Sequence, residues 1–106
     1  MASFDERAKA YEAEFAHREE LRFKVRERAI RLLALWAAER LGKSGRVGEA
    51  YAKDIVAMDV TSLKSDDAIG RVVADLHASG VSEQEVRRAM DRFLAQADAT
   101  LRGHVS

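Results

Sequence analysis

The absence of proline is the feature that most constrains this sequence. A chain of 106 residues with average composition would contain about five prolines. Because proline breaks helix interiors and is favoured in turns, a chain without it can form long uninterrupted helices. Its 19 alanines, together with many Glu, Lys, Arg and Leu residues, add strong helix formers. The composition therefore predicts an all-α protein.

Cysteine and charge counts exclude several classes of function. Without cysteine the chain has no disulfide, thiol nucleophile or thiolate metal site. Its 18 basic and 18 acidic residues balance, so it lacks the broad positive field that binds phosphate backbones, and we expect no nucleic-acid partner. The longest charge-free apolar run, Leu32 to Ala38, is far shorter than the roughly 20 residues of a membrane span. We expect a cytoplasmic protein with no direct membrane insertion.

Turn-forming residues divide the chain into helical stretches. They lie at Gly42–Gly45, Thr61–Ser65, Ser79–Ser82 and Gly103. Gly42 and Gly80 occupy positions where a left-handed residue would end a helix. Ser82 and Glu85 have the spacing of a capping box, which marks the start of the last helix.

Between these breaks, apolar residues recur every three or four positions, which is the spacing of one helix face. We expect the following side chains to face the core: Leu21, Val25, Leu32, Leu35 and Trp36; Val47, Tyr51, Ile55 and Met58; Ile69, Val72, Val73 and Leu76; and Val86, Met90, Phe93, Ala97 and Leu101. Because the connections are short, the four helices should pack roughly antiparallel. Residues 20–106 are thus predicted to form a small four-helix bundle.

Residues 1–19 carry a separate apolar stripe. Phe4, Ala8, Tyr11 and Phe15 share one helix face, and the polar run at 17–20 then interrupts it. Because the next stripe is about one residue out of phase, we interpret residues 1–19 as an amphipathic helical arm separable from the bundle. An isolated helix of this length is marginal, so we expect the arm to be frayed or loosely docked until a partner accepts it. A fifth core helix is the alternative.

Residues 37–44, A-A-E-R-L-G-K-S, match a loosened P-loop pattern with alanine in place of the first glycine. A P-loop follows a strand, whereas the residues before Gly42 are predicted to be helical. We therefore reject a true P-loop. Gly42, Lys43 and Ser44 remain candidates for weak binding of ATP or ADP, because backbone amides at a helix junction attract anions.

The remaining polar residues do not predict an enzyme. His17, His77 and His104 lie far apart in the sequence, without partners at ligand spacing, so no metal site is expected. Acidic pairs such as Asp66 and Asp67 are explained as favourable charges in first helical turns. We expect no catalytic residues and no cofactor. His17 should be solvated, with a pH-sensing role in the arm as the alternative.

Four segments carry a family resemblance. They are F-D-E-R-A-K-A-Y-E-A-E-F-A-H at 4–17, L-L-A-L-W-A-A-E at 32–39, A-Y-A-K at 50–53 and R-R-A-M-D at 87–91. With them, essentially the whole chain resembles the ATPase inhibitor zeta subunit family of bacterial F-type ATP synthases. The sequence departs from the family pattern at Ile30 and Ala34, where Asn and Gly are expected, and at Arg18, where an acid is expected.

The resemblance implies a four-helix protein that inhibits ATP hydrolysis by binding the catalytic head of the synthase, with its alpha, beta and gamma subunits, through the arm. The protein would then be associated with the membrane only peripherally, through the synthase. The implied partner-binding residues are Phe4, Asp5, Arg7, Ala8, Lys9, Tyr11, Glu12, Glu14, Phe15 and His17. A helical sensor that binds adenine nucleotide, with the arm as its output, is the alternative function.

Overall fold

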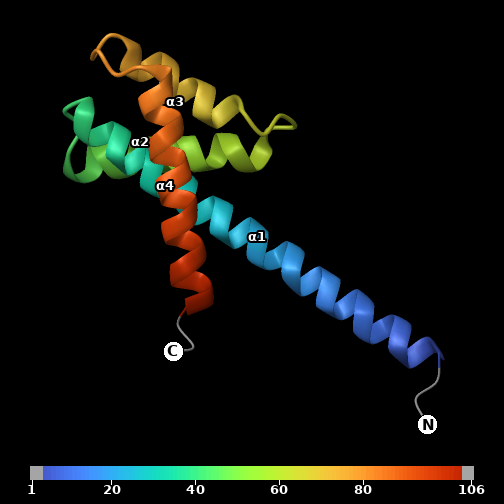
Figure 1. Cartoon of the computed structure of the whole chain (residues 1–106). Coiled ribbons are helices and arrows are strands. Elements are labelled where there is room, and N and C mark those ends of the chain that lie inside the picture. Colours follow the sequence, from blue (N-terminus) through green and yellow to red (C-terminus); the bar gives the residue numbers. More distant parts are fainter. Residues whose placement is uncertain (1–3, 104–106) are drawn as a thin grey trace.

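The computed structural model describes residues 4–103, with side chains from residue 7 onward. Over these residues the chain forms four α-helices and no strand (Figure 1). The helices are α1 (Phe4–Arg40), α2 (Gly45–Thr61), α3 (Asp67–His77) and α4 (Glu83–Arg102). The predicted all-α fold is confirmed. Predictions for the side chains of Phe4 and Asp5, and for His104, lie outside the described residues.

Helix α1 runs without a break through the polar run at 17–20. Its N-terminal half projects from the other helices, and the molecule measures 64 × 34 × 27 Å along its principal axes (Figure 1). The arm is therefore neither a fifth core helix nor docked on the bundle. Its helical state follows from continuity with the packed half of α1, because extending an existing helix avoids the cost of nucleating a new one.

The C-terminal half of α1 is the centre of the bundle and contacts α2, α3 and α4. Its buried residues are Val25, Ala29, Ile30, Leu33, Ala34, Ala37 and Ala38. Of the five side chains predicted to face inward, only Val25 is buried, whereas Leu21, Leu32, Leu35 and Trp36 are partly buried. The prediction assumed a single buried face. Leu21, Leu35 and Trp36 do pack against the core, but a second face of this segment is buried more deeply because other helices cover it from more than one side.

The other three helices complete the core with one face each. Their buried side chains are Tyr51, Ala52 and Ile55; Ala68, Ile69, Val72 and Leu76; and Val86, Ala89, Met90 and Ala97. Met58, Val73, Phe93 and Leu101 are partly buried. The prediction for Val47 is wrong, because its side chain, in the first turn of α2, is 59% exposed.

Glycines form two of the predicted turns, at the ends of α1 and α3. Gly42 and Gly80 have φ angles of 74° and 78°, in the left-handed region that favours glycine, and they follow α1 and α3. At the start of α4, the Ser82 hydroxyl accepts a hydrogen bond from the Glu85 backbone N–H at 3.1 Å. The helix ends that these local signals predict are confirmed after α1, after α3 and at the start of α4. The chain also reverses its direction between α1 and α2 and between α2 and α3 (Figure 1). Helix α4 then crosses α1 (Figure 1).

Candidate functional site

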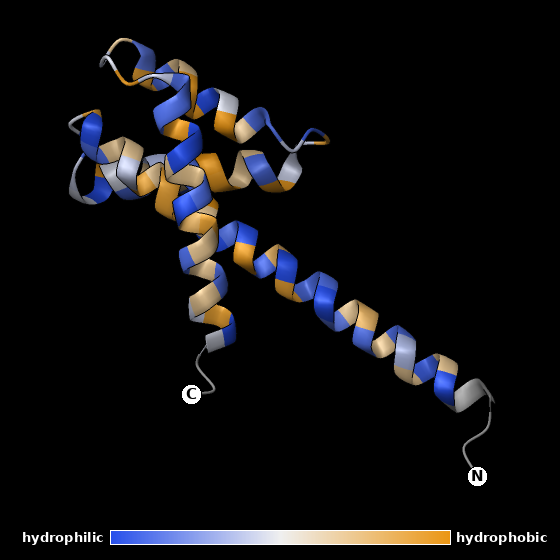
Figure 2. Ribbon diagram, in the orientation of Figure 1, coloured by the Kyte–Doolittle hydropathy of each residue, from blue (hydrophilic) through white to orange (hydrophobic). Residues whose placement is uncertain are grey.

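The arm is the most exposed part of the described chain. Every side chain from Arg7 to Glu20 is exposed, and apolar and hydrophilic residues alternate along this half of α1 (Figure 2). Tyr11 and Phe15 are 72% and 57% exposed. Two large aromatic rings held in solvent on one helix face form an apolar surface of the kind that binds partners. This part of α1 therefore presents the predicted stripe without covering it.

Charged pairs within the helix border this stripe. Arg18 contacts Glu14 at 2.8 Å, at i, i+4 spacing, and Lys24 contacts Glu20 at 3.2 Å at the same spacing. Such pairs stabilise an exposed helix by a few tenths of a kcal/mol each, roughly 0.2–0.5. The remaining predicted partner-binding side chains of the described arm are also exposed. They are Arg7, Ala8, Lys9, Glu12 and His17.

A partly buried ion pair joins α1 to the end of α2 where the arm leaves the bundle. The Arg26 guanidinium donates to both carboxylate oxygens of Asp59, with its shortest contact at 2.9 Å, and also to the Ser65 carbonyl. The Asp59 side chain is only 11% exposed. Sequence reasoning missed this contact because the partners lie 33 positions apart. The pair fixes the α2–α3 loop against the base of the arm.

The predicted nucleotide-binding residues lie at the α1–α2 turn. The backbone N–H groups of Gly42 and Lys43 donate to carbonyls at the end of α1, at 3.2 and 2.8 Å. These amides close the helix and do not point at a ligand. The Lys43 ammonium lies 4.7 Å from the ring centroid of Tyr51. Lys43 and Ser44 do line an open cavity of about 1030 Å³, which Gly42 does not.

Tyr51 belongs to a polar network that the sequence did not indicate. Its hydroxyl donates to Asp75 at 2.8 Å, and Arg71 donates to the same carboxylate oxygen at 2.9 Å. Burial raises the pKa of Tyr51, and the hydrogen bond to Asp75 raises that pKa further. The phenol thus stays protonated and keeps donating at neutral pH. The network ties α2 to α3 and supports the turn that carries Lys43.

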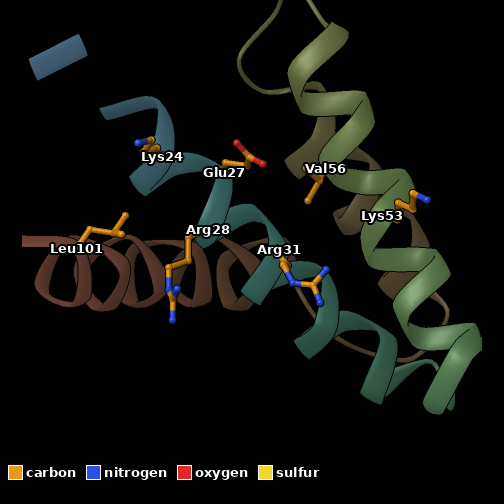
Figure 3. Close-up of a pocket in the computed structure, with 7 residues that line it drawn as sticks. All are labelled: Lys24, Glu27, Arg28, Arg31, Lys53, Val56 and Leu101. Atoms are coloured by element: carbon orange, nitrogen blue, oxygen red, sulfur yellow. The ribbon is translucent and has the colours of Figure 1, made fainter. Parts of the chain in front are cut away.

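A second cavity, of about 430 Å³, lies between α1, α2 and α4 (Figure 3). Its lining residues are Lys24, Glu27, Arg28, Arg31, Lys53, Val56 and Leu101. Arg31 and Lys53 line both cavities, so the two adjoin along the α1–α2 surface. We call the cavity of about 430 Å³ the basic cavity. Sequence reasoning missed it because its residues come from three helices.

Within 4–103, no cluster of three or more His, Asp or Glu side chains is arranged to hold a metal ion. No helix in the same range combines the length and apolar character needed to cross a membrane.

The three residues that differ from the family pattern lie in two environments. Ile30 and Ala34, where the family pattern led to an expectation of Asn and Gly, are completely buried in the core. Arg18, where an acid was expected, is exposed on the arm and pairs with Glu14. The first two positions therefore affect packing between helices, and the third affects only the charged border of the arm.

A search of curated proteins finds no match. Comparison with protein families, however, matches residues 1–100 to the ATPase inhibitor subunit zeta family. This match spans the arm, all three turns and nearly all of α4. On this match, the chain belongs to the ATPase inhibitor subunit zeta family.

Proposed function

We propose that this protein inhibits ATP hydrolysis by an F-type ATP synthase, and that it does so by inserting the arm into a catalytic subunit interface. The observation that carries the proposal is the exposure of Tyr11 and Phe15 on a helix that projects from a packed bundle. Membership of an inhibitor family supplies the activity. The protein itself performs no chemistry in this proposal.

The shape of the projecting arm suits insertion between two subunits. Burying Tyr11 and Phe15 in a partner would contribute roughly 1.5–3 kcal/mol each. Because the arm is an extension of a helix already held by the bundle, little ordering entropy opposes its binding. An interface occupied by this helix could not complete the opening and closing that each catalytic cycle requires. Inhibition would follow from obstruction of that movement.

The charged border of the arm would set its register. Arg7, Lys9, Glu12 and Glu14 are exposed beside the aromatic rings. Charges at the rim of an interface contribute to orientation and association rate more than to affinity. The apolar rings would thus anchor the helix, and the charges would select how it enters.

The test is ATP hydrolysis by the catalytic head of an F-type synthase with and without added protein. We expect hydrolysis to fall to a small residual rate as protein is added, with saturation at equal molar amounts. A head that hydrolyses ATP at an unchanged rate, although the added protein is folded by circular dichroism, would contradict the proposal.

One observation favours weak binding of adenine nucleotide as a second function. The cavity of about 1030 Å³ is lined by Lys43, Ser44 and the start of α2, where free helical N–H groups attract anions. Titration of ATP into the protein while amide NMR shifts are followed would test it. Saturable shifts at Lys43 and Ser44 support a nucleotide site, and unchanged shifts exclude it.

A further inference from the structure

The basic cavity concentrates positive charge in a protein whose net charge is zero. Lys24, Arg28, Arg31 and Lys53 line it, with Glu27 as the single carboxylate. The whole chain has equal numbers of acidic and basic residues, 18 each. An excess of positive charge is therefore gathered on one surface of α1 and α2. Such a surface attracts acidic ligands.

Two of the four cations have no acidic partner. In the range 4–103, neither Arg28 nor Lys53 forms an ion pair. Lys24 and Arg31 pair with Glu20 and Glu49, but both pairs are solvent-exposed. Exposed pairs contribute at most about 1 kcal/mol and exchange readily for a new partner. All four cations are thus available to a ligand.

The layout of the side chains discriminates between ligand classes. Figure 3 shows Lys24 and Arg28 on one side of Glu27, and Arg31 and Lys53 on the other. A compact anion placed at the centre would meet the Glu27 carboxylate. An extended segment could set acidic side chains on both sides of Glu27. Val56 and Leu101 also line the cavity and would contact apolar residues of such a segment.

The cavity also adjoins the arm. Lys24 and Arg28 follow the arm on the same continuous helix, α1. Any protein that binds the arm up to residue 19 therefore lies next to the cavity. The neighbouring cavity shares Arg31 and Lys53 and adds Lys43 and Arg46, so its four cations outnumber its two carboxylates, Glu39 and Glu49. The two adjoining cavities together offer room for a segment longer than one or two residues.

We propose that the basic cavity binds an extended acidic segment of the protein that accepts the arm. The inference rests on the proposed function, because that partner brings the segment to the cavity. Attachment would then have two parts. The arm would supply apolar anchoring, and the cavity would supply a charged contact that holds the bundle against the partner's surface.

The first test compares two double charge reversals in the full chain. Arg28→Glu with Lys53→Glu alters the cavity. Arg88→Glu with Lys64→Glu makes the same change of charge at exposed positions outside both cavities. We expect the cavity variant to bind the catalytic head at least about tenfold more weakly and with a weaker dependence on salt, because close charge pairs across an interface carry such effects. The control variant should stay within about threefold of the unaltered protein, since isolated surface charges contribute little.

Equal affinity of the two variants would overturn the inference while leaving the proposed function standing, provided that Phe15→Asp still abolishes binding. A second measurement does not depend on the synthase. A synthetic peptide of alternating glutamate and leucine is titrated into the protein, and amide NMR shifts are compared with those caused by inorganic phosphate and by ATP.

Saturable shifts at Arg28, Arg31 and Lys53 with the peptide, absent in the cavity variant, support an acidic-segment site. Saturable shifts there with phosphate or ATP, and none with the peptide, would identify a small-anion site and overturn the inference. The absence of shifts with any probe would also overturn it.

Discussion

The two halves of α1 place apolar residues in opposite environments. From Arg7 to Glu20 the helix holds aromatic rings in solvent, whereas from Val25 to Ala38 it buries mainly alanine and a few branched residues. Large exposed rings mark a surface that functions in binding. Small buried residues allow helices to approach one another closely. One continuous helix thus presents exposed aromatic rings at one end, which we propose to bind the partner, and forms the centre of the core at the other.

The two halves also differ in what stabilises them. The arm depends on local ion pairs, such as Glu14 with Arg18, and on continuity with the packed half. The packed half depends on contacts with three other helices. A change in the arm should therefore alter binding and leave stability nearly unchanged, whereas a change in the core should do the reverse.

Removing the arm should give the largest functional effect. Deletion of residues 1–19 should abolish inhibition, because both described aromatic anchors are lost. The unfolding midpoint should move by less than about 5 °C, equivalent to about 1 kcal/mol, because the buried side chains begin at Val25. Hydrolysis assays and thermal melts followed by circular dichroism measure the two quantities. Full inhibition by the truncated protein, or a midpoint lower by about 20 °C, would show that the halves are not separable.

A carboxylate at the end of the aromatic stripe tests whether the arm binds through its apolar face. Phe15→Asp should weaken inhibition by more than about a hundredfold, because about 2–3 kcal/mol of ring burial is lost and an unpaired charge must be desolvated. Lys9→Ala is the matched comparison and should cost less than about 1 kcal/mol, since a solvated rim charge contributes little. Inhibition constants at two salt concentrations decide the point. A larger loss for Lys9→Ala would mean that the arm binds chiefly through charge.

A core substitution tests the other half of α1. Ile30 is completely buried. Ile30→Ala should lower the free energy of unfolding by about 2–5 kcal/mol, through lost burial and the cavity that remains. Phe15→Ala, on the exposed half, should change it by less than about 0.5 kcal/mol. Urea unfolding provides both values. Inhibition by Ile30→Ala under conditions where it is folded should equal that of the unaltered protein, and a large loss would show that the core shapes the arm's binding surface directly.

The smallest expected effect is on stability at acidic pH, and it should be confined to the bundle. The Arg87 guanidinium hydrogen-bonds Asp66 and holds the pKa of that carboxyl below its usual range. A carboxyl whose pKa is lowered on folding stabilises the protein above its unfolded pKa, and that contribution is lost as pH falls through the folded value. The unaltered protein should therefore lose slightly more stability than Asp66→Asn below about pH 4. Urea midpoints measured from neutral to acidic pH compare the two, and identical curves would show that the pair contributes nothing.

Local signals in the sequence predicted the backbone well. The missing prolines, the glycines at 42 and 80 and the Ser82 cap act within a few residues, and the structure reproduces the helix ends they indicate. The arm's stripe was also readable, because Ala8, Tyr11 and Phe15 share a face whatever lies beyond it. Only their role in binding a partner stays a prediction.

Alanine shows most clearly what the sequence by itself left open. Eight of the eighteen buried apolar residues in the range 4–103 are alanine, while Ala8 and other alanines of the arm are exposed. Their side chains are too small and too frequent for periodicity to separate the two groups. Val47 was misplaced and the second buried face of α1 was not seen for a related reason, because a spacing pattern does not reveal where neighbouring helices end or how many sides they cover.

Two features of the candidate surfaces were decided only by tertiary structure. Arg26 and Asp59 pair across 33 positions, and the basic cavity takes residues from three helices. The sequence determined where helices begin and end and which face of the arm is apolar, because those properties arise from neighbouring residues. Packing decided which residues are buried and which cations line the same cavity, because both depend on distances between helices that no local pattern encodes.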